Sequence, residues 1–307
     1  MRNTAVRTLA QLATEGVDLH FITADLGFRV LEPFRDAHPA RFTNAGVSEA
    51  NMVSIAGGMA MTGIRPVCYS MVPFVFFRAF EQVRVDVVAP RLNVVLIGVG
   101  GGLSYGHEGV THHAIEDLAM ARSLPGLRVI APADPRELTA ALRWALTASG
   151  PTYIRVGQNN DPNVHENDVA SVASPIRVRN GDDRFVVFST GHITATAATA
   201  VDRLKQANGI GASLFSVPTL KPFDAERIRE IVRTSRAVVT VEEHSVIGGL
   251  GTAIAELLFE TRFVGRFAKI ALPDEYCDTH GTLPWLRRRY ELDDESIARR
   301  LAKVFDG

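Results

Sequence analysis

The chain has 307 residues, 46% of them hydrophobic and 22% charged, a composition typical of a globular protein with enough apolar material for two domains. Its formal net charge of −1 gives no electrostatic reason to expect binding to nucleic acid or to an anionic membrane. The two cysteines, Cys68 and Cys277, lie in different halves and predict neither a disulfide framework nor a zinc site.

The N-terminal stretch MRNTAVRTLAQLATEG predicts an amphipathic helix and lacks the compact apolar core of a signal peptide. The longest apolar run, NVVLIGVGGGL, is too short and too rich in glycine to span a bilayer. We therefore expect a cytoplasmic enzyme that binds neither membranes nor nucleic acid.

Strand-like apolar runs alternate with helical patterns through the first half of the chain. The expected strands are DLHFITA, RPVCYSM, NVVLIGVG, LRVIAPA and TYIRVG, and the expected helices cover residues 49–62, 74–88, 114–124 and 135–148. This alternation is typical of a mostly parallel α/β sheet. The polar, turn-rich stretch QNNDPNVHENDVASVASP is interpreted as interdomain sequence. We place the first domain at residues 1–165 and the linker at 166–183.

The second half repeats the alternation. Its expected strands are RFVVFST, GASLFSVP, RAVVTVEE and FAKIALP, and its expected helices cover residues 195–206, 224–234, 252–259 and 294–305. The predicted fold class is therefore α/β, with two doubly wound, mostly parallel-sheet domains, the second and smaller one at 184–307. Open sheets of this kind bind ligands beyond the carboxyl ends of their strands, which directs attention to the loops after ITA, CYSM and NVVLIGVG.

A single carboxylate, Glu49, stands at the head of the small and apolar helix in AGVSEANMVSIAGGMAMTG. One interpretation is that Ser48 or Glu49 caps the helix N-terminus, where negative charge is favourable. The other is that Glu49 faces a ligand. The local sequence leaves both open.

Two further segments carry residue types that serve in catalysis or ligand binding. The glycine-rich loop GVGGGLSYGHEGVTHHAIEDLA does not match G-x-G-x-x-G in register, and its glycines suit either close approach of a ligand or a tight turn. It also holds His107, Glu108, His112 and His113 close together, which allows a metal site, although one loop without further converging ligands is poor evidence for it. Proton transfer or hydrogen bonding to substrate oxygens fits the histidine pair as well, and a helix-capping or core role is the alternative for His112 or His113. In PFVFFRAFEQVR, three phenylalanines at i, i+3 and i+6 predict either core packing or a stacking wall for a flat heterocycle: Phe74, Phe77 and Phe80.

The motifs resemble the C-terminal half of a transketolase. The resemblance rests on FTNAGVSEANMVSIAGGMAMTG, the phenylalanine triplet, GLSYGHEGVTHHAIEDLAMARSLPGLRVIAPAD and TYIRVG. In the second domain, STGHITATA, SVPTLKPFD and VTVEEHSVIGGLGTAIAELL resemble the last domain of that family. The resemblance covers nearly the whole chain.

The resemblance implies a role for Glu49. In this thiamine-diphosphate family, the glutamate at this position hydrogen-bonds N1′ of the cofactor's aminopyrimidine. Proton sharing there favours the imino tautomer, whose N4′ takes the proton from C2 of the thiazolium and so generates the reactive carbanion. A carboxylate shielded from water suits this role because it binds its proton more readily. Phe77 is the implied stacking partner, and the remaining implied neighbours of the cofactor are Phe74, Phe80, Asp25 and Leu26.

The resemblance also implies contacts with the substrate. His112 would face the oxygens at the reacting carbon, Glu108 a sugar hydroxyl, and Arg155 a substrate phosphate. The alternative for Arg155 is a surface arginine in an ion pair. Two positions depart from the family pattern. Gly100 stands where many relatives have a histidine, and Arg29 stands where a phosphate-contacting serine is common. We expect Arg29 to contact a substrate that differs from the standard pentose phosphates.

Full-length transketolases begin with a domain that holds the diphosphate through Mg²⁺, using a Gly-Asp-Gly motif and a downstream asparagine. No such pair occurs here, and NGDDRF lacks both the glycine pattern and the following ligands. The resemblance therefore implies one half of a split enzyme, with no metal ligands of its own. Thiamine diphosphate would bind by its aminopyrimidine end, and a partner subunit would hold Mg²⁺ in an α2β2 heterotetramer.

The leading hypothesis is transfer of a two-carbon ketol unit from a ketose, expected to be a phosphate, to an aldehyde. The β subunit of a 2-oxo acid dehydrogenase is an alternative, since it shares both domains and the glutamate; the EGVTHHAIEDLAM loop favours transketolase. An activity like that of 1-deoxyxylulose-phosphate synthase and a non-catalytic partner subunit that keeps the fold are further alternatives.

Overall fold

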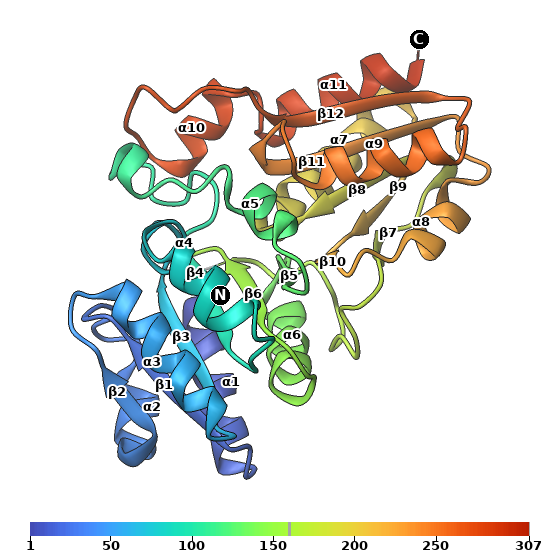
Figure 1. Cartoon of the computed structure of the whole chain (residues 1–307). Coiled ribbons are helices and arrows are strands. Elements are labelled where there is room, and N and C mark those ends of the chain that lie inside the picture. The colour runs from blue at the N-terminus through green and yellow to red at the C-terminus, as the bar shows by residue number, and fades with distance from the viewer. Residues whose placement is uncertain (159–160, 307) are drawn as a thin grey trace.

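The protein is described by a computed structural model that covers residues 1–158 and 161–306. Residues 159–160, in the expected interdomain stretch, and residue 307, at the end of the expected second domain, lie outside the described residues. Figure 1 shows two α/β domains, one coloured blue to green and the other yellow to red. This architecture confirms the predicted fold class.

The first domain contains a seven-stranded sheet in the order β10-β5-β6-β4-β3-β1-β2. Its described pairings are parallel, except that β10 pairs antiparallel with β5. The sequence did not predict β2, nor that β10, from the second half of the chain, joins the first sheet. The strands are β1 (Leu19–Thr23), β2 (Phe42–Asn44), β3 (Arg65–Met71), β4 (Val95–Val99), β5 (Arg128–Ile130), β6 (Thr152–Val156) and β10 (Thr219–Lys221).

Helices cover both faces of this sheet, because the strands carry apolar side chains on both sides. Phe21 and Ile97 belong to a core beneath α1 and α6, whereas Ile22 and Leu96 belong to the core on the opposite face. At α6, the Asp134 side chain caps the helix by accepting hydrogen bonds from two backbone N–H groups. The helices are α1 (Arg2–Thr14), α2 (Glu32–Ala37), α3 (Glu49–Met61), α4 (Phe80–Gln82), α5 (Asp117–Ser123) and α6 (Pro135–Thr147).

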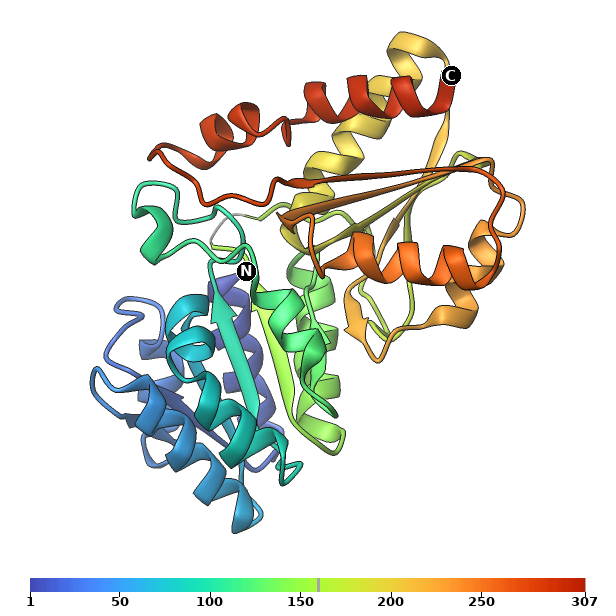
Figure 2. The same ribbon diagram turned by 45° about the horizontal axis from the view of Figure 1, so that its top comes forward.

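The second domain contains a five-stranded sheet in the order β12-β11-β8-β9-β7. In Figure 2, orange α9 lies on one side of this sheet, and yellow α7 and red α11 lie on the other. The strands are β7 (Ile176–Arg179), β8 (Asp182–Thr190), β9 (Ala212–Ser216), β11 (Ala237–Ser245) and β12 (Arg266–Leu272). The helices are α7 (Thr194–Asn208), α8 (Ala225–Val232), α9 (Leu250–Glu260), α10 (Leu283–Arg289) and α11 (Asp294–Asp306).

The segment between the domains differs from the expected linker. Strand β7 and the start of β8 lie within residues 166–183, so the second sheet begins before the expected position 184. The preceding residues pack against the first domain: the Asp134 carboxylate accepts from the backbone N–H groups of Val164 and His165 (2.9 and 3.2 Å), and His165 Nε2 lies 2.7 Å from Glu137 Oε1.

The two domains share packing and backbone contacts. One hydrophobic core cluster is continuous between them, since it contains Met52 and Phe76 of the first domain and Phe188 and Ile254 of the second. Ser245 N donates to the carbonyl oxygen of Ile115 across the boundary (2.7 Å). A shared core of this kind fixes the relative position of the domains and of any site between them. Among the helices in the described part of the chain, none is long and apolar enough to cross a membrane.

Candidate active site

Glu49 is the first residue of α3, and its carboxylate is buried, with 2% of the side chain exposed. The Ser48 hydroxyl does not cap the helix; it donates instead to the Ala45 carbonyl oxygen (2.8 Å). A charge in the first turn is favourable toward the helix dipole, but burial of a carboxylate is costly without a partner. That partner is Arg78, whose Nη1 donates to Glu49 Oε2 at 2.7 Å.

The segment expected as one helix over residues 74–88 is not a regular α-helix. Wider π-helical turns cover Pro73–Arg78 and Val83–Val88, with the short α4 between them. Because a π turn contains more residues than an α turn, side chains three apart no longer share one face. Phe76 is the fully buried ring, stacked on Tyr153 with centroids 4.6 Å apart.

The three predicted phenylalanines therefore have different surroundings. Phe77 and Phe80 are partly buried and contact the Phe76 ring, with centroids 6.3 and 5.7 Å away. Phe74 lies against His112 instead, with ring centroids 5.2 Å apart. Phe77 and Phe80 thus pack against the core ring of Phe76, whereas Phe74 lies on the side of the histidine loop. A stacking role of these rings toward a heterocycle stays a prediction.

Arg78 contacts both Glu49 and the Phe74 ring, which in turn lies against His112. While Nη1 binds Glu49, its Cζ lies 4.4 Å from the centroid of the Phe74 ring, a cation–π arrangement. The Arg78 side chain is 49% exposed. The structure thus brings Glu49, Arg78, Phe74 and His112 together in one contiguous set. The sequence does not indicate a site role for Arg78, because the carboxylate that it pairs with lies 29 positions away along the chain.

The glycine-rich loop after β4 is packed against side chains of the protein itself. A Cβ at Gly101 would lie 2.0 Å from Arg155 Nε, and one at Gly102 would lie 2.3 Å from Glu243 Oε1. Gly102 also has φ +66°, a conformation that side chains disfavour. Of the two interpretations of these glycines, the structure favours the tight, closely packed loop.

The two adjacent histidines of this loop differ in environment. His112 is partly buried, and its Nδ1 lies 2.9 Å from Thr111 Oγ1. His113 is 5% exposed, and burial lowers its pKa, so that its ring is neutral at pH 7. His107 and Glu108 are exposed in the same loop. Among the described residues, no group of three or more His, Cys, Asp or Glu side chains is arranged to hold a metal ion.

Arg155, on β6, is buried rather than open to a substrate, with 4% of its side chain exposed. Its Nη2 donates to the carbonyl oxygens of Ala114 (3.0 Å) and Glu243 (2.8 Å), and its Nε lies 3.4 Å from Asp117 Oδ2. Tyr153 donates to the same Asp117 oxygen (2.7 Å), and burial raises the pKa of Tyr153 well above its usual value. The ion pair of the alternative interpretation is therefore present, but Arg155 is buried rather than at the surface. Its phosphate contact stays a prediction.

The loop after β1 holds the remaining predicted residues. Asp25 is exposed, with a left-handed backbone (φ 52°), and its N–H donates to Asn44 Oδ1 (2.8 Å). Asn44 also accepts from Gly46 N (3.0 Å), so it connects this loop to the turn before α3. Leu26 is partly buried, and Arg29 is exposed with φ 65°. None of the hydrogen bonds described for this loop reaches His112, so its role in the site stays a prediction.

Comparison with protein families matches both domains. Residues 1–162 match the family model described as "Transketolase, pyrimidine binding domain", and residues 175–297 match the one described as "Transketolase, C-terminal domain". These ranges agree with the two sheets described above, apart from β10, which lies in the second range and joins the first sheet.

Individual relatives extend over almost the whole chain. One subunit of the apulose-4-phosphate transketolase from Phocaeicola vulgatus is 33% identical over 303 residues, which cover 97% of this chain and 95% of that protein. The 6-deoxy-6-sulfo-D-fructose transketolase subunit SqwH from Clostridium sp. strain MSTE9 is 33% identical over 306 residues, covering 99% and 94%. A solved structure described as "Split gene transketolase, inactive beta4 tetramer" superposes with a TM-score of 0.87 at 32% identity, covering 99% and 97%. The chain therefore belongs to the transketolase family and contains its pyrimidine-binding and C-terminal domains.

Proposed function

We propose that this chain is the cofactor-pyrimidine-binding subunit of a split transketolase, which transfers a two-carbon ketol unit from a ketose phosphate to an aldehyde. The observation that carries the proposal is the buried carboxylate of Glu49, whose only described side-chain partner, Arg78, is half exposed. Phe74 and His112 adjoin that pair.

These residues fit the aminopyrimidine end of thiamine diphosphate. The heterocycle needs a carboxylate shielded from water beside an apolar surface, and Glu49 with the ring of Phe74 nearby meets this need. When bound, thiamine diphosphate supplies the carbon nucleophile of ketol transfer. Once Arg78 has released the Glu49 carboxylate, Glu49 would hold the proton at N1′ of the pyrimidine. Phe77, Phe80, Asp25 and Leu26 would line the rest of the cofactor's surroundings.

His112 would bind the substrate oxygens at the reacting carbon. Since Thr111 Oγ1 lies beside Nδ1, Nε2 is the ring atom that would face the substrate. Glu108 and Arg29, both exposed, would contact the sugar farther from the reacting carbon. The guanidinium of Arg155 contacts two carbonyl oxygens and Asp117, which supports a role in holding the glycine-rich loop. Its contact with a substrate phosphate stays a prediction.

The diphosphate and Mg²⁺ are assigned to a second polypeptide, in an α2β2 assembly. The names of two relatives support this assignment, since both describe subunits of a transketolase. So does the description of the solved structure, in which a tetramer of β chains is inactive. The same two names describe sugars with a phosphate and a sulfo group, which supports a substrate that carries an anionic group.

The test is a native pull-down of the chain from its host, followed by reconstitution. A stoichiometric partner with a Gly-Asp-Gly motif and a downstream asparagine is expected. The reconstituted complex, supplied with thiamine diphosphate and Mg²⁺, should transfer ketol units from ketose phosphates, and neither subunit alone should do so. Recovery of the chain only with itself would contradict the proposal, as would a complex that oxidatively decarboxylates 2-oxo acids without ketol transfer.

A further inference from the structure

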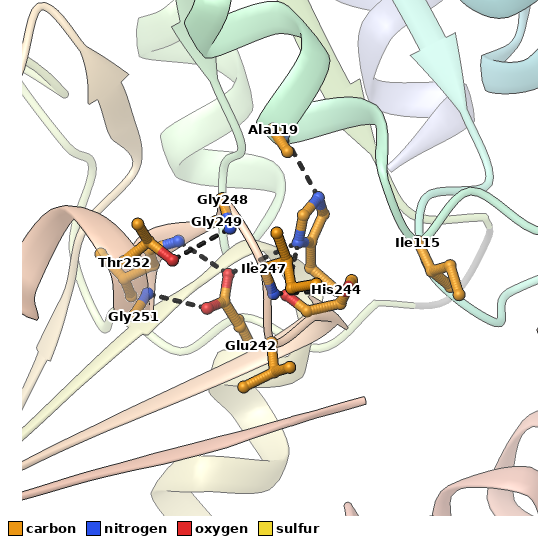
Figure 3. Close-up of polar contacts among 12 residues, drawn as sticks. Ile115, Ala119, Glu242, His244, Ile247, Gly248, Gly249, Gly251 and Thr252 are labelled. Atoms are coloured by element: carbon orange, nitrogen blue, oxygen red, sulfur yellow. Dashed lines mark hydrogen bonds and ion pairs between the residues drawn. The ribbon is translucent and has the colours of Figure 1, made fainter. Parts of the chain in front are cut away.

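The segment VTVEEHS in β11 directs consecutive side chains to opposite faces of the second sheet, as a strand requires. On one face, Glu242 accepts from the N–H groups of Leu250 and Gly251 at the start of α9 (2.7 and 2.8 Å), and His244 Nε2 accepts from Ala119 N (3.3 Å). Figure 3 shows the contacts of Glu242 with Gly251 and of His244 with Ala119. Glu243, between them, points the other way, toward the glycine-rich loop of the first domain.

Within its own domain, the Glu243 carboxylate is held by two cationic or polar groups. Arg287 Nε, on α10, donates to Oε2 at 2.6 Å, and His192 Nε2 lies 3.2 Å from Oε1. Glu243 is 1% exposed, and burial alone would raise its pKa; the charges of Arg287 and His192 instead hold the pKa well below its usual range. The group is therefore a fixed carboxylate at neutral pH.

The same carboxylate reaches the other domain. Leu103 N, in the glycine-rich loop, donates to Oε1 at 2.9 Å, a hydrogen bond between residues 140 positions apart. The close approach requires glycine at the preceding position, where a Cβ would lie 2.3 Å from Oε1. A hydrogen bond to an ionised acceptor is stronger than one between neutral groups, so this contact fixes the backbone at Leu103 firmly.

The contact lies at the base of the loop that carries His112. Gly102 and Ala114 exchange backbone hydrogen bonds (2.7 and 3.0 Å), which bring the two ends of residues 103–113 together. Arg155 also contacts the base of this loop, since its Nη2 donates both to Ala114 O and to Glu243 O. A further contact from the C-terminal domain, Gly281 N to Gly106 O (3.0 Å), supports the outer part of the loop, which lies beside α10 in Figure 1.

We infer that Glu243 is a positioning residue: through Leu103 N it places the base of the 103–113 loop, and hence His112, for the reaction. The effect on the reaction rests on the function proposed for His112. The hydrogen bond between Leu103 N and Glu243 does not depend on that function. The C-terminal domain, which contributes none of the proposed catalytic groups, thereby acts on the substrate loop.

The first test measures the contact in the full chain alone, by hydrogen exchange of amides in residues 100–116. Glu243→Ala should increase exchange at Leu103 and Ala114 by about 10- to 100-fold. Glu243→Gln, which keeps the size and one acceptor oxygen, should give a smaller increase and keeps the test valid if the alanine variant does not fold. Glu242→Gln is the matched control, a neighbouring buried glutamate that should change exchange at the start of α9 and not in the loop. Unchanged loop exchange in both Glu243 variants, or an equal increase in Glu242→Gln, would overturn the inference.

The second test uses the reconstituted complex. Glu243→Gln should lower kcat/KM for the sugar by about 10- to 100-fold, since small displacements of a catalytic group have effects of this size. The affinity for thiamine diphosphate should remain that of the wild type, and Glu243→Asp should restore part of the activity. If Glu243→Gln increases hydrogen exchange in the loop but keeps the wild-type kcat/KM, the positioning role of Glu243 is overturned. A wild-type complex without ketol transfer would contradict the proposed function instead, and the exchange data would still decide whether Glu243 holds the loop.

Discussion

Glu49 and Glu243 are both almost completely buried, yet their surroundings differ in a way that bears on function. Glu243 contacts Leu103, His192 and Arg287, and Arg287 is itself only 14% exposed. Glu49 has a single described side-chain partner, Arg78, which is 49% exposed. A buried carboxylate with several buried partners has a structural role, because each partner would be left unsatisfied without it. A buried carboxylate with a single, half-exposed partner can exchange that partner for a ligand at a lower cost.

The largest expected effect is on turnover. In the reconstituted complex, Glu49→Gln should lower kcat by about 10²- to 10⁴-fold, the range for a group that transfers or holds a proton in the reaction. Assembly should be intact, since the amide has the same shape. The matched control is Glu81→Gln, an exposed glutamate on the neighbouring α4 with a 3.5 Å contact to Arg84. Turnover that survives in Glu49→Gln would show that Glu49 is not the activating acid.

The next effect is on stability and concerns Glu243. Arg287→Ala leaves that carboxylate buried without its guanidinium and should reduce the free energy of unfolding by about 3–5 kcal/mol. Arg289→Ala, on the same helix, is the control: Arg289 is 45% exposed and pairs with exposed Asp278, so its loss should cost less than about 1 kcal/mol. The measurement is urea denaturation of the chain near pH 7. Equal effects of Arg287→Ala and Arg289→Ala would show that the buried pair with Glu243 stabilises the fold no more than an exposed ion pair does.

A pH series should show the structural role of Glu243 independently. The pKa of Glu243 is lower in the folded state than its usual value of 4.5, so its ionised form contributes stability above pH 4.5. That contribution declines as the pH falls below 4.5, by at most about 1.4 kcal/mol per pH unit. Wild-type protein should therefore lose stability more steeply than Glu243→Gln between pH 4.5 and 3. Parallel stability curves for the two proteins would show that Glu243 is not held ionised in the fold.

The smallest effect is expected at Arg78. Because the Arg78 side chain is half exposed, water screens its pair with Glu49, and removal of that side chain in Arg78→Ala admits water to the carboxylate instead of leaving it buried and unpaired. The free energy of unfolding should therefore fall by only about 1 kcal/mol. Denaturation of the isolated chain measures this directly, with Arg84→Ala as an exposed control. A loss equal to that of Arg287→Ala would mean that the fold depends on both arginines to the same extent, and the proposed exchange of Arg78 for a cofactor would fail.

The order of strands and helices was predictable from the sequence because their signals are local. Runs such as RPVCYSM and NVVLIGVG carry enough consecutive apolar residues to identify β3 and β4, and Asp134 before Pro135 marks the start of α6. The π turns over Pro73–Arg78 and Val83–Val88 were not predictable, because a change of hydrogen-bond register leaves no compositional signal. The burial of Phe76 rather than Phe77 or Phe80 in the core follows from these turns, and the stacking role that the resemblance implies for Phe77 stays a prediction.

The sequence by itself determined the α/β class, the position of Glu49 at a helix start and the glycine run before His112, since these depend on residues next to one another. Only the tertiary structure decided which groups those residues meet. Arg78 pairs with Glu49 from 29 positions away, and Leu103 donates to Glu243 from 140 positions away. It also decided that Arg155 is enclosed and that β10 joins the first sheet. Such contacts depend on how two domains pack, and no local pattern of residues encodes the distance between segments so far apart along the chain.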